Sequence, residues 1–280
     1  MKLRSLLFVP ADRADRMAKA VQSPADSVVL DLEDSVALDR KAAARATLAA
    51  FLAGETRRQP LLVRINPLQG GMSAQDIACL ADHPPDALML PKAGGRTSID
   101  QLDAVLACYG LEHLPVLPIG TETPSAVFEL GTYRERSHRL LGLTWGAEDL
   151  SSAIGAIATR EGGDRFTAPY ELVRSLALFA AHAAGVAAIE TVHPDFRDLE
   201  RLSRVATRAA QDGFAGMMAI HPAQLDAIHR AFEPSEQALA RARAIVEAFA
   251  AHPGAGALSL GGEMVDLPHL TLARRLLADR

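Results

Sequence analysis

Two acidic residues, Glu122 and Asp149, each follow a short apolar run and stand just before a segment typical of a helix start. The two runs are Val116–Ile119 and Leu140–Thr144. If they are neighbouring strands of one parallel sheet, both carboxylates lie at the same edge of that sheet, where loops build binding sites. Two carboxylates together suit a hard cation that prefers oxygen ligands, such as Mg2+. The spacing therefore predicts a magnesium site formed by Glu122 and Asp149.

The elements that must position this pair alternate regularly along the chain. Short apolar runs are separated by amphipathic helical stretches, and the runs are continuous rather than alternating, which is typical of strands buried on both faces. Eight such strand–helix units in about 230 residues predict an α/β fold, the TIM (β/α)8 barrel. The expected strands are Leu6–Val9, Val28–Leu32, Leu61–Ile65, Ala87–Leu90, Val116–Ile119, Leu140–Thr144, Ala187–Val192 and Gly216–Ile220.

Helix boundaries between these strands carry recognisable signals. Ser98 is expected to cap a helix at Ile99–Tyr109, and glycines at 110, 185 and 213 follow expected helix ends. The alternative fold is a doubly wound open sheet, which would usually carry a glycine-rich phosphate turn after its first strand, whereas the turn Val9–Arg13 has no glycine. The other expected helices are Arg13–Val21, Arg40–Leu52, Tyr170–Ala184 and Asp198–Gln211.

We expect a barrel domain over residues 1–232 and a C-terminal helical extension over residues 233–280. After Phe232 the sequence predicts a long helix to about Ala251, a turn at Pro253–Gly256, and a tail that ends in a last helix. This extension is a candidate for contact with a neighbouring subunit.

The composition excludes several classes of function. The 280 residues are 49% hydrophobic and carry a formal net charge of -5 without a basic block, so a nucleic-acid partner is not expected. The charges of Arg197–Arg208 alternate with apolar positions, as on a solvated helix face. No stretch reaches the roughly 20 apolar residues of a membrane span. Cys79 and Cys108 belong to no paired motif, and no signal peptide is recognised, which favours a cytoplasmic protein.

Ionisable residues follow nearly every expected strand. Arg64 leaves an apolar strand directly, so its guanidinium should be held in place, where it suits a carboxylate or a developing enolate. The alternative is a structural ion pair with Glu33 or Asp34. Other strand-end residues are Pro10, Asp12, Arg13, Arg16, Asp31, Asn66, Lys92, Glu122, Glu148, Asp149, Glu190, His193 and His221.

Five of these residues have more than one interpretation. Lys92 could form a Schiff base, as in aldolases that use no metal, but an electrostatic role is favoured. His193 and His221 could bind zinc, yet each precedes a proline and no third histidine or cysteine accompanies them. We therefore expect both histidines to pack in turns. Glu122 and Asp149 could instead be a structural pair held by Arg64 and Lys92.

Several motifs, in this order and spacing, resemble the citrate lyase β-subunit-like branch of the HpcH/HpaI aldolase superfamily. The resemblance extends over almost the whole chain. It implies a TIM barrel assembled as a homotrimer or hexamer, with Mg2+ on Glu122 and Asp149. The motifs are Arg4–Pro10, Asp31–Val36 with Lys41 and Arg45 behind it, Val63–Pro67, Leu90–Lys92, Glu122–Thr123, Gly146–Leu150 and Ala219–Gln224.

The resemblance also implies a reaction. Family members cleave or form carbon–carbon bonds in 3-hydroxyacyl-CoA thioesters such as citryl-, malyl- or citramalyl-CoA, releasing a thioester such as acetyl-CoA and a small keto or aldehyde acid. Arg64 would contact the substrate and stabilise the enolate, and Asp266 of a neighbouring subunit would act as the base. Glu33 is a further catalytic candidate, and Glu148 joins Arg64, Glu122 and Asp149 as a substrate-binding candidate.

The first loop and helix offer Arg13, Arg16 and Lys19 as candidate contacts for the CoA phosphates, although exposed basic residues are often only solvated. The chain departs from the family pattern at Ala93–Gly95, at Glu190 and His193, and at Glu263, where a lysine is frequent. The last change removes a positive charge that could help to hold CoA.

Three other readings of the site stay open. One is a thioesterase or malate-synthase-like enzyme that uses the same residues. A second is a metal-free Schiff-base aldolase with Lys92 as nucleophile. The third is a barrel without catalysis that serves as a subunit of a larger complex, because true citrate lyase β subunits work only with α and acyl-carrier subunits.

Overall fold

The computed structural model of the protein describes residues 1–54, 58–162 and 165–278. Over these residues the chain divides into two compact units, Met1–Phe232 and Glu233–Arg280. Residues 279 and 280, the end of the expected extension, lie outside the described residues.

The first unit is built on eight parallel strands in the order β5-β4-β3-β2-β1-β10-β9-β6. Two parallel bridges, Val116 with Leu140 and Ile119 with Thr144, join the outer strands β5 and β6 and close the sheet into a barrel. The predicted TIM barrel is thus confirmed. The strands are β1 (Ser5–Pro10), β2 (Ser27–Asp31), β3 (Leu61–Arg64), β4 (Ala87–Leu90), β5 (Val116–Pro118), β6 (Gly142–Thr144), β9 (Ala187–Glu190) and β10 (Gly216–Ala219).

Burial on both faces explains why these strands are continuous apolar runs. In β2, Val28 and Leu30 belong to the large core that the strands share with the helices, while Val29 belongs to a smaller core formed largely by strand residues. Leu6 and Leu62 belong to the same smaller core. The eight predicted strands all occur, with ends that differ from the prediction by one or two residues.

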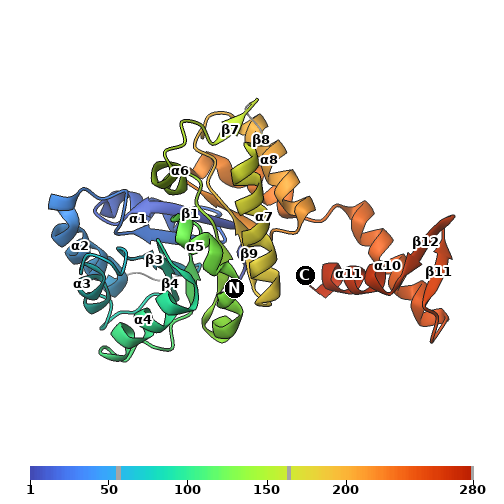
Figure 1. The fold of residues 1–280 in the computed structure, drawn as a ribbon, viewed down its shortest axis with the longest axis horizontal. Helices are drawn as coiled ribbons and strands as arrows, with labels where there is room; N and C mark the ends of the chain where they lie inside the picture. The colour runs from blue at the N-terminus through green and yellow to red at the C-terminus, as the bar shows by residue number, and fades with distance from the viewer. Residues whose placement is uncertain (55–57, 163–164, 279–280) are drawn as a thin grey trace. The chain divides into compact units, whose positions relative to one another are not determined.

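Helices surround the barrel strands (Figure 1). One boundary prediction is wrong: α4 begins at Gly95, not at Ile99, and Ser98 lies in its first turn, where its hydroxyl accepts the Gly94 N–H at 2.8 Å. Gly94 occupies the N-cap position without a side-chain cap, and Gly95 after it has a φ of +65°. The helices are α1 (Ala14–Ala20), α2 (Lys41–Gly54), α3 (Ser73–Ala78), α4 (Gly95–Ala107), α5 (Pro124–Glu129), α6 (Glu148–Ile154), α7 (Ala168–Ala183), α8 (Leu199–Asp212) and α9 (Leu225–Phe232).

Smaller elements fill the loops of the first unit. A two-stranded hairpin, β7 (Arg160–Glu161) with β8 (Arg165–Phe166), lies between α6 and α7. Three 3₁₀ helices cover Leu38–Arg40, Leu130–Arg139 and Pro222–Gln224. No helix in the described part of the chain combines the length and apolar character that crossing a bilayer requires.

The second unit has its own small core. It contains α10 (Glu236–Ala251), a hairpin of β11 (Ala257–Leu260) and β12 (Glu263–Asp266), and α11 (Leu267–Ala278). The tail is therefore not purely helical. Gly261 and Gly262 form the two-residue turn that a tight hairpin needs, with φ of 61° and 86°. The buried core residues are Ala242, Ile245, Phe249, Val265, Leu270 and Ala273.

Candidate active site

A cavity of about 460 Å³ lies at the carboxyl ends of the barrel strands. Its wall includes five of the residues predicted to bind the metal, the substrate or CoA, all of them in the unit Met1–Phe232. The bridges between β5 and β6 make Glu122 and Asp149 neighbours at this end, as their positions predicted. The five residues are Arg16, Arg64, Glu122, Glu148 and Asp149.

Glu122 follows β5 and is almost fully buried, with 3% of its surface exposed. Its Oε2 accepts a short hydrogen bond from the backbone N–H of Lys92. Gly146 allows this placement, since a Cβ there would lie 3.0 Å from Glu122 Cγ. Burial raises the pKa of Glu122 to about 8, against the lowering effect of the Lys92 N–H, and the charges of Asp149 and Glu33 add to the rise. The site therefore holds a carboxylate that lacks a counter-charge of its own.

Asp149 and Glu148 lie in the first turn of α6, directly after β6. The Asp149 side chain is 34% exposed, and its Oδ1 lies 3.2 Å from Lys92 Nζ. Glu148 is exposed and lines the cavity. Three carboxylates of different exposure, from Glu122, Glu148 and Asp149, therefore meet at this end of the barrel.

Arg64, at the end of β3, is held as rigidly as the sequence predicted, but by a partner that the sequence did not identify. Its Nε and Nη2 donate to the two carboxylate oxygens of Asp31 at 2.6 and 2.7 Å. Its Nη1 lies 3.1 Å from Glu33 Oε2 and 3.9 Å from Asp34 Oδ2. Burial opposes the charge, but the hydrogen bond and charge of Asp31 raise the pKa of Arg64, so the guanidinium stays protonated.

Glu33 and Lys92 form a second ion pair beside Arg64. Lys92 Nζ donates to Glu33 Oε1 at 2.6 Å. Burial lowers the pKa of Lys92, but the hydrogen bond to Glu33 and the surrounding carboxylates outweigh it and raise the pKa above the ordinary value. A Schiff-base lysine needs a neutral amine, so this environment argues against Lys92 as a nucleophile. Burial is the main cause that raises the pKa of Glu33.

The residues around the cavity fit a magnesium ion. Mg2+ is typically held by one or two carboxylates, with water and substrate oxygens completing its coordination. Glu122 and Asp149 supply such a pair, and Glu122 in particular lacks a cationic partner among the described contacts. Within the described ranges, no three His, Cys, Asp or Glu side chains gather as a complete metal cage. The carboxylate oxygens of Glu122 and Asp149 suit a hard cation that retains part of its water.

The remaining predicted residues lie in different surroundings. Arg13 and Lys19 are exposed on and beside α1, and Arg13 pairs with Asp15 at 3.2 Å. Of the three predicted CoA contacts, Arg16 is the one whose side chain lines the cavity. Asp266 lies in the second unit, where its Oδ1 is hydrogen-bonded to His269 Nδ1 and this contact lowers its pKa.

The two histidines differ in their contacts. His221 caps the 3₁₀ helix Pro222–Gln224 by accepting the Ala223 N–H at 3.1 Å, and it stacks on Phe196. His193 is 2% exposed, and neither ring nitrogen has a hydrogen-bond partner within the described residues. Burial lowers its pKa, and Arg160 and Arg201 reinforce the effect.

A buried network behind the cavity was not predicted. Trp145 lines the cavity, and its indole N–H donates to Glu190 Oε1 at 2.6 Å. Arg174 Nε donates to the other oxygen of Glu190 at 2.6 Å and Arg174 Nη1 to Asp212 at 2.7 Å. Glu190 was recognisable at a strand end, but nothing local in the sequence pairs it with Trp145 or Arg174.

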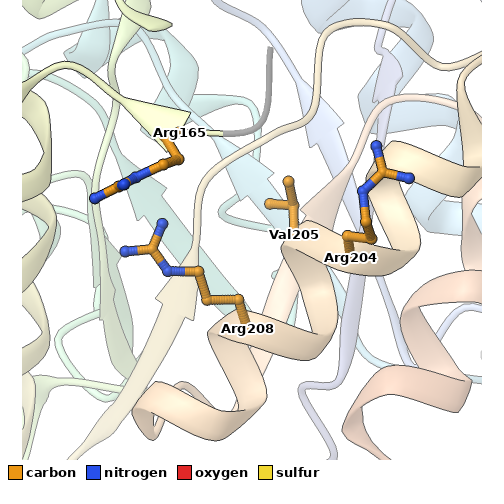
Figure 2. A pocket seen from close by; sticks show the side chains of 4 residues that line it. All are labelled: Arg165, Arg204, Val205 and Arg208. Atoms are coloured by element: carbon orange, nitrogen blue, oxygen red, sulfur yellow. The ribbon is translucent and has the colours of Figure 1, made fainter. Parts of the chain in front are cut away.

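A second cavity of about 380 Å³ is lined by arginines (Figure 2). Arg165 comes from β8, and Arg204, Val205 and Arg208 come from α8. Arg208 is already paired with both carboxylate oxygens of Glu171, at 3.0 and 2.9 Å. Arg204 points away from Arg165 and Arg208 (Figure 2). Among the described residues, three arginines and a valine line this second cavity, whereas carboxylates line the first one.

Comparison with known proteins places this geometry in a family. A family model described as HpcH/HpaI aldolase/citrate lyase matches residues 4–222. A citrate lyase subunit beta-like protein of Mycobacterium tuberculosis is 36% identical over 97% of this chain and 93% of its own length. A (3S)-malyl-CoA thioesterase of Cereibacter sphaeroides is 30% identical over 98% and 93%.

A solved structure agrees over the full length. The M. tuberculosis CitE protein, in complex with magnesium, acetoacetate and coenzyme A, superposes with a TM-score of 0.85 at 34% identity, covering 99% of this chain and 97% of that one. With a family model over most of the chain and relatives above 30% identity over nearly all of it, the chain belongs to the HpcH/HpaI aldolase/citrate lyase family.

Proposed function

We propose that the protein is a Mg2+-dependent carbon–carbon lyase that acts on a 3-hydroxyacyl-CoA thioester of the citryl-, malyl- or citramalyl-CoA type. The observation that carries the proposal is the meeting of Glu122, Asp149 and Arg64 around one cavity at the strand ends. The CitE relative bound to magnesium, acetoacetate and coenzyme A supports the same combination of metal, small acid and thioester.

In this proposal Glu122 and Asp149 hold the metal, and Glu148 borders the space for the small acid. When bound, Mg2+ supplies Lewis-acid polarisation of the oxygen on the carbon that is attacked or released. Arg64 lines the same cavity as Glu122 and Asp149, so the substrate carboxylate would be held by two positive groups, the guanidinium and the bound cation.

Arg64 stabilises the charge that develops on the thioester. As the substrate hydroxyl loses its proton and becomes a carbonyl, the carbon–carbon bond breaks and its electron pair passes to the thioester as an enolate. Asp31 holds the guanidinium still, so it is already oriented when that charge appears. Glu33 contacts Arg64 and Lys92 and is not among the residues that line the cavity, so we place it as the residue that positions both cations.

In this scheme the ionised Asp266 of a neighbouring subunit accepts the proton that the substrate hydroxyl loses and then delivers it to the enolate carbon. The hydrogen bond from His269 keeps the Asp266 carboxyl ionised, and both side chains are partly exposed on the second unit. A shared site of this kind requires an oligomer, for which we propose a homotrimer or hexamer.

We further propose that Arg13, Arg16 and Lys19 contact the CoA phosphates. We also propose that the protein works in the cytoplasm, where its cysteines, Cys79 and Cys108, stay free.

Glu122→Ala tests the metal assignment. We expect loss of Mg2+-dependent cleavage and of measurable Mg2+ binding, because the buried ligand is removed. Cleavage is followed by the release of the small keto acid, and binding by calorimetry. Glu112→Ala, which removes an exposed carboxylate, is the matched control and should behave like the wild type. Full Mg2+-dependent activity in Glu122→Ala would show that the metal is held elsewhere.

Hydrolysis of the thioester is a second candidate activity on the same site, favoured by the 30% identity to a (3S)-malyl-CoA thioesterase. The two reactions differ in their products. A lyase releases a thioester together with a keto or aldehyde acid, whereas a thioesterase releases free CoA. Incubation of the enzyme with malyl-CoA, with separate detection of free thiol and of glyoxylate, distinguishes them.

A further inference from the structure

Lys92 connects the acidic residues of the site. It follows β4, and its ammonium lies 2.6 Å from Glu33 Oε1 and 3.2 Å from Asp149 Oδ1. Its backbone N–H donates to Glu122. One residue therefore contacts three carboxylates, which come from the segments after β2 and β5 and from α6.

The residue that makes these contacts also has an unusual backbone conformation. Lys92 has φ of +51°, and no other non-glycine residue in the described part of the chain has a positive φ. A left-handed conformation is unfavourable for a residue with a side chain, because its Cβ lies too close to the following carbonyl oxygen. Such strain persists where the surrounding contacts hold it, typically at functional sites. A lysine that served only to fill space would not need this conformation.

Asp149 can interact with either of two cations. It is a proposed ligand of the divalent ion, and its Oδ1 also forms an ion pair with the Lys92 ammonium. The contact with Glu33 is shorter, and Glu33 is more deeply buried than Asp149. The ammonium can therefore lose Asp149 and still keep a carboxylate partner, which avoids leaving a buried charge unpaired.

We propose that Lys92 is a positioning residue that competes with the divalent cation for Asp149 and thereby sets the affinity of the site for that cation. The inference rests on the proposed function in that the cation is the one assigned there to Glu122 and Asp149. Lys92 stays on Glu33 when the cation takes Asp149, and its amide keeps Glu122 directed into the site in both arrangements.

Binding of Mn2+, followed by electron paramagnetic resonance on the full-length protein, tests the competition. In Lys92→Met the competing charge is gone, so Mn2+ should bind about tenfold more tightly than in the wild type, since neighbouring unit charges interact by more than 1.4 kcal/mol in a partly buried site. Lys2→Met, which removes an exposed lysine, should leave the affinity unchanged. Unchanged or weaker Mn2+ binding in Lys92→Met would overturn the proposal.

Lys92→Gly separates charge from backbone strain. It removes the same ammonium, while glycine adopts a positive φ without strain. Tightening of Mn2+ binding in both Lys92→Met and Lys92→Gly supports competition by charge. Tightening in Lys92→Gly alone would assign the effect to the backbone and overturn the proposal.

A measurement on the wild type needs a variant only to assign one signal. The lysines of the chain are Lys2, Lys19, Lys41 and Lys92, so a protein labelled with 13C at lysine Cε gives few signals, and Lys92→Arg identifies the one from Lys92. Titration with Mg2+ should shift the Lys92 signal and leave that of Lys2 in place. A Lys92 signal that does not respond at saturating Mg2+ would contradict the proposal.

These outcomes are distinct from failure of the proposed function. If the wild type binds Mn2+ and Glu122→Ala does not, the metal assignment stands whatever the Lys92 variants do. If the wild type binds no divalent cation at all, the metal assignment itself is wrong, and the inference about Lys92 is wrong with it.

Discussion

Single side chains at the barrel mouth form a series of ion pairs that does not include Glu122. Arg64 is shared by Asp31 and Glu33, and Lys92 by Glu33 and Asp149. Glu122 accepts a hydrogen bond from one backbone N–H and forms no ion pair within the described residues. An unmatched buried carboxylate costs stability when ionised, and its raised pKa expresses that cost. A cation supplied from solution would remove it.

This imbalance predicts how stability depends on pH when divalent cations are chelated. The pKa of Glu122 is about 8 in the folded protein and 4.5 in an unperturbed chain, so between these values the folded state holds a proton that the unfolded state has lost. Stability contributed by Glu122 is therefore fully present below pH 4.5 and is lost as the pH rises through 8, by on the order of a few kcal/mol.

Urea unfolding of the wild type and of Glu122→Gln, in EDTA between pH 5 and 8, measures this effect. The free energy of unfolding of the wild type should fall with pH relative to that of Glu122→Gln, which cannot ionise. The comparison removes the contributions of all other titrating groups, because they are common to both proteins. Parallel curves for the two proteins would contradict the predicted pKa shift.

At the scale of elements, the turn from β6 into α6 is the part of the fold on which the site depends most. Over five consecutive residues it supplies the cavity wall at Trp145, the close approach at Gly146 and the carboxylates of Glu148 and Asp149. Trp145 is tied to Glu190 of β9. The turn is thus anchored from behind, while Gly146 gives the Glu122 side chain room in front.

Gly146→Ala should disturb the metal site without disturbing the barrel. The added Cβ would lie 3.0 Å from Glu122 Cγ and 3.4 Å from Oε1, closer than ordinary van der Waals contact, so the carboxylate must shift. We expect Mg2+ affinity to fall by about tenfold, equivalent to roughly 1.4 kcal/mol, with little change in melting temperature. Gly131→Ala is the matched control, since its Cβ would meet no atom within 4 Å. Equal Mg2+ affinity in the two variants would show that Glu122 tolerates the crowding.

At the scale of the whole molecule, the chain consists of a barrel unit and a smaller unit with its own core. The cavity is lined from the first unit alone, whereas Asp266 ends strand β12 of the second. The proposed proton transfer therefore joins residues of two separate units. In our proposal Asp266 acts in the site of a neighbouring subunit, so activity would be a property of the oligomer.

Mixed oligomers test this arrangement. Asp266→Asn and Arg64→Ala should each be inactive, and Asp266→Asn should still bind the CoA thioester because the barrel is unchanged. When the two variants are unfolded and reassembled together in equal amounts, about a quarter of the wild-type activity should return. Half of the barrels are then intact, and half of the neighbouring subunits supply Asp266. Verified mixed oligomers without activity would argue against shared sites.

Much of the fold follows from the sequence because a barrel strand is buried on both faces, and such strands are recognisable as continuous apolar runs. The closure of eight strands then makes the ends of β5 and β6 neighbours, so the juxtaposition of Glu122 and Asp149 was predictable. The β11–β12 hairpin was not, because its exposed strands alternate weakly and only the Gly261–Gly262 turn marks it.

The sequence by itself determined the barrel, the end of it that carries the chemistry, and the residue types that meet there. Only the tertiary structure decided which charges pair: Asp31 with Arg64, Glu190 with Trp145 and Arg174, and Lys92 with three carboxylates. Strand order depends on hydrophobic patterns that each segment carries locally. Ion pairing depends on side-chain positions to within about an ångström between residues far apart in the chain, and no local pattern encodes those positions.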